Sequence, residues 1–222
     1  MDEFAVARTK MVDSQLRTEG VTDYDILAVM GRVARETFVP HQQRPLAYLD
    51  SDIPIKSGAG GEPRALMEAA PFARLLQMAE IDKDDIVLDI GCGTGYSAAV
   101  IAGLANFVVG LESDSDLAAQ ARANLSAAKI DNARVVVGTL DDGYAADGPY
   151  DVIVIDGAVE VIPSALFSQL KEGGRLVAVV GYGRAAPAML YTKSSHEIGR
   201  RVGFNADVPP LPGFKKPKAF VF

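Results

Sequence analysis

The chain has 222 residues, of which 49% are hydrophobic and 23% charged, and its formal net charge is −7. Without a block of Lys and Arg, this acidic balance excludes a chain-wide basic surface for nucleic acid, and the longest apolar stretch, residues 98–111, is too short to span a membrane. The one cysteine excludes an intrachain disulfide, and the charged N-terminus lacks the apolar core of a signal peptide. We therefore expect a cytoplasmic protein that acts as a monomer, with neither a nucleic acid nor a membrane as its partner.

The first part of the chain has two helical patterns followed by an irregular stretch. Apolar residues recur at helical spacing over residues 3–18, which predicts an amphipathic helix. Thr22 is the expected N-cap of a second helix, whose apolar stripe runs from Ile26 to Val33. Residues 41–64 are rich in Gly and Pro and predict a long irregular loop, and loops of this length are commonly functional or disordered.

From Ile86 onward, apolar strands alternate with helical patterns. The strands expected here are residues 87–90, 107–112, 134–138, 151–156 and 173–181, with a tight turn at Gly173-Gly174. Helices are expected over residues 96–104, 116–128 and 163–170, and shorter strand-like runs follow at 187–193 and 219–222. Strands that are apolar on both faces and alternate with helices favour a parallel sheet covered on both sides.

The stretch "DIGCGTGY" links the first of these strands to its helix. Gly91, Gly93 and Gly95 have the spacing G-x-G-x-G, whereas a dinucleotide fingerprint needs G-x-G-x-x-G and a P-loop needs Gly-Lys-Ser/Thr. Glu112 ends the second strand, where a carboxylate can accept hydrogen bonds from both hydroxyls of a ribose. Asp89 can order the loop or meet a cationic group. These features indicate a ligand with a ribose and a positive charge but no phosphate, which describes S-adenosylmethionine; a dinucleotide enzyme is the alternative.

The same residues resemble motif I and its acidic partner in the class I methyltransferases. That resemblance implies a Rossmann-like α/β fold: a seven-stranded, mostly parallel sheet with helices on both faces and an N-terminal helical cap. Cys92 is expected to be a small side chain near the cofactor rather than a catalytic thiol, because no histidine is near it in sequence. The resemblance implies cofactor-binding roles for residues of the glycine turn and the strand ends: Asp89, Gly91, Cys92, Gly93, Thr94, Gly95, Glu112, Ser113, Thr139, Leu140 and Asp156.

A narrower resemblance covers residues 11–181. The chain is similar to the protein-L-isoaspartate O-methyltransferases in four segments and in their order: "MVDSQLRTEGVTDYDILAVMGRVARETFVP", "AYLDSDIPI", "VLDIGCGTGYSAAVIAGL" and "IPSALFSQLKEGGRLVAVVG". That family methylates the free carboxylate of isoaspartyl residues in damaged proteins. Such a carboxylate is ionised at pH 7, so the reaction needs no general base, and catalysis depends on positioning and on the exclusion of water.

The acceptor side departs from the family pattern. The family carries Thr-Ile-Ser, a residue and then Pro, and anchoring on Pro71 places Ala69 where the serine stands. Arg64 can replace the serine by binding an acceptor carboxylate with two hydrogen bonds, or it is an ordinary solvated arginine at a helix start. Glu68 would repel an acceptor carboxylate, or it is an exposed helix carboxylate. Asp156 could bind a metal, but "VAVVGYGR" supplies no second ligand, and we expect no metal.

We therefore predict one methyltransferase domain over residues 1–222. Residues 1–80 are expected to form the helical cap and the acceptor-side segment, and residues 81–222 the cofactor-binding core. The expected activity is S-adenosylmethionine-dependent methylation of an isoaspartyl carboxylate in a protein or peptide substrate. Two alternatives stay open. One is methylation of a small molecule or another protein group by an enzyme of the same ancestry, and the other is S-adenosylmethionine binding without catalysis.

Overall fold

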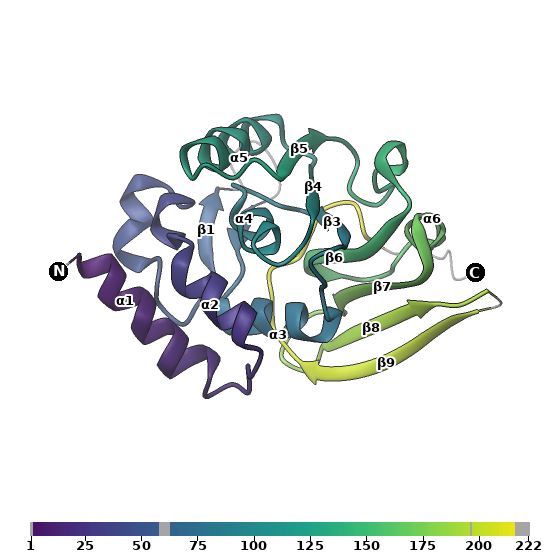
Figure 1. The fold of residues 1–222 in the computed structure, drawn as a ribbon, viewed down its shortest axis with the longest axis horizontal. Coiled ribbons are helices and arrows are strands. Elements are labelled where there is room, and N and C mark those ends of the chain that lie inside the picture. The colour runs from purple at the N-terminus through teal and green to yellow at the C-terminus, as the bar shows by residue number, and fades with distance from the viewer. Residues whose placement is uncertain (1, 58–62, 196, 216–222) are drawn as a thin grey trace, which may run out of the picture.

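A seven-stranded sheet lies at the centre of the computed structural model, which describes residues 2–57, 63–195 and 197–215. The strand order is β5-β4-β3-β6-β7-β8-β9 (Figure 1). Neighbours from β5 to β7 pair in parallel, and β8 and β9 extend the sheet in antiparallel fashion at one edge. This is the Rossmann-like, mostly parallel sheet that the alternating sequence pattern predicts.

Helices and strands follow one another along the whole described chain. The helices are α1 (Glu3–Met11), α2 (Tyr24–Arg32), α3 (Ala69–Ala79), α4 (Tyr96–Ala102), α5 (Ser115–Ala127) and α6 (Ser164–Ser168), with short helical turns η1 (Val12–Leu16), η2 (Arg35–Thr37), η3 (His41–Leu46) and η4 (Ala145–Asp147). The strands are β1 (Ile53–Lys56), β2 (Arg64–Leu66), β3 (Ile86–Ile90), β4 (Phe107–Glu112), β5 (Ala133–Val137), β6 (Tyr150–Val159), β7 (Leu170–Val180), β8 (Pro187–Lys193) and β9 (Ile198–Asn205). Among the described residues, no helix combines the length and apolar character needed to cross a membrane.

Side chains along the central strands alternate between two cores, one on each face of the sheet. On one face, Val87 of β3 and Val152 of β6 belong to the core that includes α3, α4 and α5, and α2 packs outside α3 and α4. On the other face, Leu88 and Ile153 pack in a core with α6 and with Leu211 of the C-terminal segment, residues 206–214. Both faces of the central strands β3 and β6 are therefore buried, which explains their apolar sequences.

A buried arginine holds the N-terminal cap to the rest of the fold. Arg35 donates from Nε to the Ala47 carbonyl at 2.9 Å and from Nη2 to the Met67 carbonyl at 2.6 Å. Its guanidinium carbon lies 4.7 Å from the ring centroid of Tyr96, the first residue of α4. These contacts fix the cap against the helix that follows the glycine turn.

The N-terminal helices follow the predicted pattern, with one shifted cap. The predicted helix over residues 3–18 is confirmed as α1, continued by the single π-helical turn η1. The predicted N-cap Thr22 is wrong. Asp23 caps α2 instead, because its carboxylate accepts hydrogen bonds from the amides of Asp25 and Ile26 at 2.9 and 3.0 Å. Thr22 donates its own amide to Oε1 of Gln77 at 2.8 Å.

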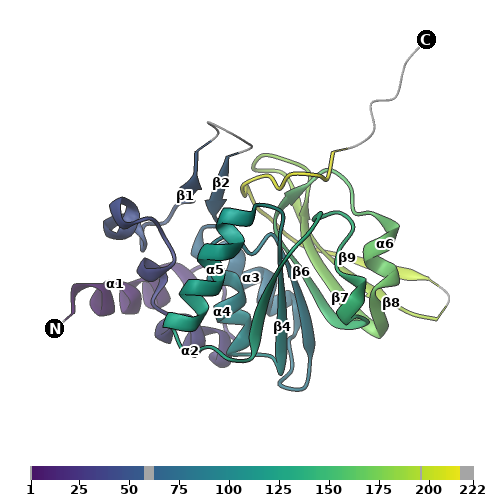
Figure 2. The same ribbon diagram turned by 90° about the horizontal axis from the view of Figure 1, so that it is seen from above.

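The described part of residues 41–64 is more regular than the predicted loop. It contains η3 and the strand β1, and β1 pairs antiparallel with β2, so that Ile53 lies opposite Leu66 and Lys56 opposite Arg64. With four and three residues, these strands give only a short alternation in the sequence. Figure 2 shows this hairpin beside the C-terminal segment, at the same end of the sheet.

The predicted strands of the core are confirmed as β3 to β8, but the last strand differs. β9 is residues Ile198–Asn205, and all its residues except Phe204 are exposed, so it lacks an apolar pattern. The strand-like run at 219–222 lies outside the described residues. The predicted turn at Gly173-Gly174 is an irregularity within β7, where Gly173 has a φ of 75°.

Candidate active site

The glycine turn connects β3 to α4 at the carboxyl edge of the sheet. Gly91, Gly93 and Gly95 have φ values of 86°, 53° and 93°, in the left-handed region that favours glycine. The amide of Gly91 donates to the Leu111 carbonyl of β4 at 2.8 Å, which holds the turn against the neighbouring strand. A Cβ on Gly95 would lie 3.2 Å from Ala121, so the third glycine lets the turn approach α5 closely.

Glu112 is the last residue of β4, and its side chain is fully buried. One carboxylate oxygen accepts hydrogen bonds from the amides of Ser113 and Asp114, at 2.9 and 3.1 Å. The other oxygen accepts one from the amide of Gly93 at 2.9 Å. These three backbone donors fix the carboxylate between the glycine turn and the start of α5.

Arg64 of β2 lies directly on this carboxylate. Its Nη1 and Nη2 donate to the two Glu112 oxygens at 2.5 and 2.9 Å, and Nη2 also donates to the Gly91 carbonyl at 3.1 Å. The exposed fractions of the Arg64 and Glu112 side chains are 5% and 0%. The alternative of a solvated arginine at a helix start is therefore wrong. Arg64 binds a carboxylate with two hydrogen bonds, but that carboxylate is the protein's own.

Two further carboxyl groups, Asp89 of β3 and Asp156 of β6, lie at this edge of the sheet. Ser97 Oγ donates to one oxygen of Asp89 at 2.7 Å, while Oδ1 of each aspartate is buried without a hydrogen-bond partner. Burial and the charge of Asp156 raise the pKa of Asp89 well above its ordinary value, and burial raises the pKa of Asp156 to about 6. Within the part of the chain that the structure describes, no group of three or more His, Cys, Asp and Glu side chains could hold a metal ion.

The remaining residues predicted to line the cofactor site differ in their surroundings. Cys92 is buried, and burial raises the pKa of its thiol well above the ordinary value, which suits a packing residue rather than a nucleophile. Thr94 is also buried and donates its Oγ1 to the Phe38 carbonyl at 2.5 Å, tying the glycine turn to the cap. Beyond β5, Leu140 is buried in the core and Thr139 is exposed.

The candidate acceptor residues Glu68 and Ala69 lie at the start of α3. Ala69 is the buried first residue of this helix, and Glu68 is its N-cap, whose amide donates to Asp52 Oδ1 at 2.8 Å. The Glu68 side chain is half-buried rather than exposed. Burial, with a hydrogen bond to Asp50, raises the pKa of Glu68 to about 7. Arg64 and Glu68, close in sequence, thus have different partners.

The β1–β2 hairpin and the C-terminal segment cover the glycine turn, whereas the sequence predicts a helical cap and an acceptor-side segment within residues 1–80. Ile55 Cδ1 lies 2.8 Å from the position that a Cβ on Gly93 would take. A Leu211 methyl carbon lies 2.8 Å from the corresponding position on Gly91. The alternation of Ile53 and Ile55, both buried in β1, is a sequence signal that could have suggested a strand here.

Comparison with known proteins by sequence finds the family that the four sequence segments resemble. Residues 7–204 match the model of the protein-L-isoaspartate(D-aspartate) O-methyltransferase family. A protein-L-isoaspartate O-methyltransferase of Koribacter versatilis is 40% identical over 178 residues, which are 80% of this chain and 78% of that protein. One of Methanoculleus marisnigri is 41% identical over 174 residues, 78% of this chain and 77% of that protein.

Comparison with solved structures gives a consistent result. A protein-L-isoaspartate O-methyltransferase structure, 27% identical, matches 93% of this chain and 66% of its own with a TM-score of 0.81. A structure named for a Plasmodium falciparum protein-L-isoaspartate O-methyltransferase, 19% identical, shares the fold over 92% of this chain and 97% of its own, with a TM-score of 0.74. The chain belongs to the protein-L-isoaspartate(D-aspartate) O-methyltransferase family.

Proposed function

We propose that the protein transfers a methyl group from S-adenosylmethionine to the free carboxylate of isoaspartyl residues in proteins or peptides, acting as a cytoplasmic monomer. The buried Glu112 carboxylate at the end of β4, beside a turn of left-handed glycines, is the observation that carries this proposal. The similar Plasmodium falciparum structure contains S-adenosyl-L-homocysteine, the product that this methyl donor leaves. We assign Glu112 to the two ribose hydroxyls of the cofactor.

The other residues of the site fit this cofactor. Oδ1 of Asp89 and Oδ1 of Asp156 are buried acceptors without partners, and such atoms suit a ligand that brings hydrogen-bond donors and positive charge. Gly91 and Gly93 have no side chains of their own, and the space where their Cβ atoms would lie is taken by Leu211 and Ile55. We assign Asp89 to the cationic part of the cofactor and the buried Leu140 to the adenine side.

The reaction requires the protein to position the cofactor and the acceptor, and it requires no proton transfer. The cofactor supplies a methyl group activated by the adjacent sulfonium. An acceptor carboxylate is ionised at neutral pH, so its oxygen bonds to the methyl carbon as the carbon–sulfur bond breaks and its electron pair passes to sulfur. No proton moves in this step. The residues of the chain therefore need to orient two ligands and exclude water.

Acceptor recognition depends on the start of α3, where Ala69 offers no hydroxyl. Arg35 holds the Met67 carbonyl just before it, so the backbone of this segment is fixed. The raised pKa of Glu68, about 7, means that this carboxyl is largely protonated below neutral pH. Protonation removes the charge of Glu68 itself, while the charges of Asp50 and Asp52, which help to raise this pKa, remain beside it.

Transfer of labelled methyl groups to a pair of peptides tests the proposal. One peptide carries isoaspartate and the other carries aspartate at the same position. We expect label on the isoaspartyl peptide alone. Calorimetric titration with S-adenosyl-L-homocysteine, run alongside, distinguishes a wrong acceptor assignment from a wrong cofactor assignment. Cofactor binding without transfer to the isoaspartyl peptide would contradict the acceptor assignment and favour a different acceptor or none. Absence of binding both by the wild type and by a variant without the Arg64 side chain would contradict the cofactor assignment.

A further inference from the structure

The carboxylate assigned to the ribose is already fully hydrogen-bonded within the protein. Glu112 accepts hydrogen bonds from the amides of Gly93, Ser113 and Asp114 and from two nitrogens of Arg64, all at 3.1 Å or less. A carboxylate offers about four lone-pair positions. The five donors already exceed these positions, so the ribose hydroxyls can bond to Glu112 only in place of the two Arg64 nitrogens, because the three amides belong to the fixed backbone of the site.

The position of Arg64 is supported by the rest of the hairpin. Lys56, which lies opposite Arg64 in the β1–β2 register, makes an ion pair with Asp114, two residues after Glu112. The hairpin is thus tied to the end of β4 by two cations, one from each strand. Leu211 covers Gly91 from the C-terminal segment, beside Nη2 of Arg64. Arg64 is therefore held on Glu112 by packing as well as by charge.

Pairing with Arg64 offsets the cost of burying the Glu112 carboxylate in the free protein. A carboxylate buried at the end of a strand is costly without a cation or enough donors, and removing one partner of such a pair destabilises a fold strongly. The guanidinium supplies two parallel N–H donors and one positive charge. A ribose supplies two hydroxyl donors, and the sulfonium of the methyl donor brings a positive charge. The cofactor can therefore replace what Arg64 provides.

We propose that Arg64 is an internal stand-in for the cofactor, which occupies Glu112 in the free protein and has to leave before the ribose can bind. The inference rests on the proposed assignment of Glu112. Arg64 then stabilises the free protein and lowers its affinity for the cofactor. The apparent dissociation constant equals the intrinsic one divided by the fraction of molecules in which Arg64 is away, so an Arg64 that is away in about 10% of molecules weakens binding about tenfold.

Calorimetric titration with S-adenosyl-L-homocysteine tests this competition, because that ligand binds without reacting. Arg64→Met keeps an unbranched apolar side chain, shorter than that of Arg, and removes its donors, and we expect it to lower Kd by about tenfold or more. Arg64→Lys keeps the charge but cannot donate to both oxygens, and we expect an intermediate Kd.

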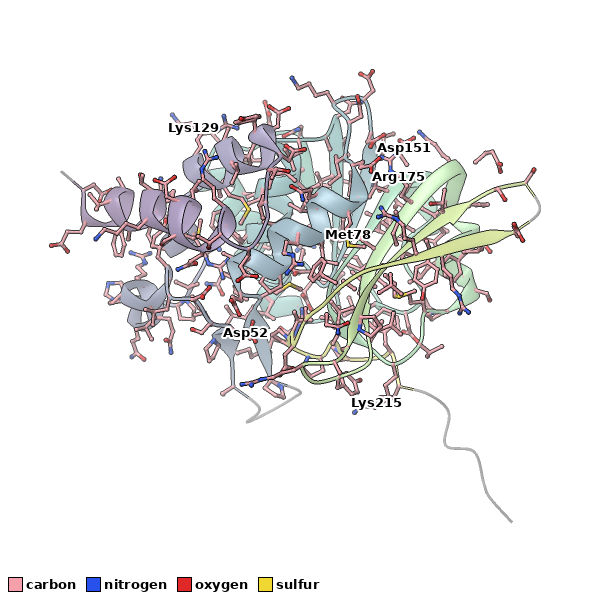
Figure 3. All side chains as sticks on the ribbon, turned by 90° about the horizontal axis from the view of Figure 1, so that it is seen from below. Asp52, Met78, Lys129, Asp151, Arg175 and Lys215 are labelled. Atoms are coloured by element: carbon pink, nitrogen blue, oxygen red, sulfur yellow. The ribbon has the colours of Figure 1, made fainter. Side chains whose placement is uncertain are left out.

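A matched control is Arg175→Gln, which breaks an ion pair with Asp85 at 2.5 Å. Figure 3 shows Arg175 near Asp151, at the edge of the molecule away from Asp52 and Lys215. Asp52 directly precedes the hairpin and Lys215 follows the C-terminal segment, so the control lies far from the site. We expect Arg175→Gln to leave Kd unchanged.

Thermal unfolding gives a second measurement, because a purely structural role of Arg64 would not increase the stabilisation by ligand in the variant. Arg64→Met leaves the Glu112 carboxylate buried without its cation, so we expect a lower unfolding temperature than that of the wild type in the absence of ligand. Tighter binding then predicts a larger rise on saturation with S-adenosyl-L-homocysteine. If Arg64 instead helps to form the binding site, the variant should bind the ligand more weakly, and its unfolding temperature should rise less on saturation.

The two proposals fail in distinguishable ways. If the wild type binds S-adenosyl-L-homocysteine and both Arg64 variants bind it equally or more weakly, the stand-in role is wrong and the cofactor assignment stands. If neither the wild type nor Arg64→Met binds, the cofactor assignment and the stand-in role are both wrong. Tighter binding by Arg64→Met, with Arg64→Lys between it and the wild type, supports both.

Discussion

At the scale of single residues, the surroundings of a carboxyl group decide what it can do. Glu112 lies among three backbone donors and a guanidinium, whereas Asp89 has one hydroxyl partner and an orphaned oxygen. The end of a strand predicts Glu112 as a ligand-binding acid. Arg64 is 48 positions away, and no local pattern links two residues at that separation, so their pairing could not be predicted from the sequence.

Replacement of Glu112 tests its role in cofactor binding. We expect Glu112→Ala to weaken binding of S-adenosylmethionine by about 1–3 kcal/mol, because it removes the charged partner of the ribose hydroxyls. Calorimetry gives the affinity, and circular dichroism checks that the variant folds with Arg64 unpaired. Glu172→Ala, at an exposed position of β7, is the control. An unchanged affinity in Glu112→Ala would rule out the ribose assignment.

The pKa of Glu68 predicts a pH dependence of stability. Burial and the hydrogen bond to Asp50 raise this pKa from 4.5 to about 7, so the folded state holds the proton more tightly than the unfolded chain. The free energy of unfolding should therefore fall as pH rises from about 4.5 to 7, with no further loss from this group above that range.

Comparison with Glu68→Gln isolates this contribution, because the amide can still donate to Asp50. We expect the free energy of unfolding of the variant, relative to that of the wild type, to increase as pH rises from 5 to 8. Urea unfolding at both pH values measures this difference. The exposed Glu172→Gln is the control, whose difference from the wild type should be constant. A constant difference for Glu68→Gln as well would show that the carboxyl titrates normally.

At the scale of elements, strands of five or more residues with a buried apolar run were predictable, and shorter or exposed strands were not. The strands β3 and β4 are buried over nearly their whole length, and their limits agree with the apolar runs. The strands β1 and β2 have four and three residues, and β9 is an exposed edge strand whose residues carry no alternation. The pairing of β1 with β2 places Arg64 on Glu112. Because the hairpin was not predicted, the contact of Arg64 with the glycine turn could not be predicted either.

The close packing of the glycine turn on α5 gives a prediction at this scale. Gly95 and Gly20 both have positive φ, 93° and 83°, but a Cβ would meet Ala121 at 3.2 Å at Gly95 and nothing within 4 Å at Gly20. Gly20→Ala should cost about 1–2 kcal/mol through backbone strain alone. Gly95→Ala should cost about 1–3 kcal/mol more, because the backbone of α5 cannot yield easily. Equal losses in urea unfolding would show that the turn and α5 are not tightly packed.

At the scale of the whole molecule, the two edges of the parallel sheet differ in kind. At the amino edge, ion pairs such as Lys171–Asp151, with both members half-buried, and Arg175–Asp85, with a buried aspartate, join neighbouring elements. At the carboxyl edge, the glycine turn and Glu112 are buried beneath the hairpin and the C-terminal segment. The alternating pattern predicts the sheet and this edge as the ligand side. It cannot predict the cover, which comes from segments before and after the α/β core.

A crystal structure of the protein with S-adenosyl-L-homocysteine tests the central assignment most directly. We predict both ribose hydroxyls within hydrogen-bonding distance of the Glu112 carboxylate, with the Arg64 guanidinium displaced from it. A complex in which the ligand binds elsewhere, or in which Arg64 still donates to both Glu112 oxygens beside the bound ligand, would contradict it.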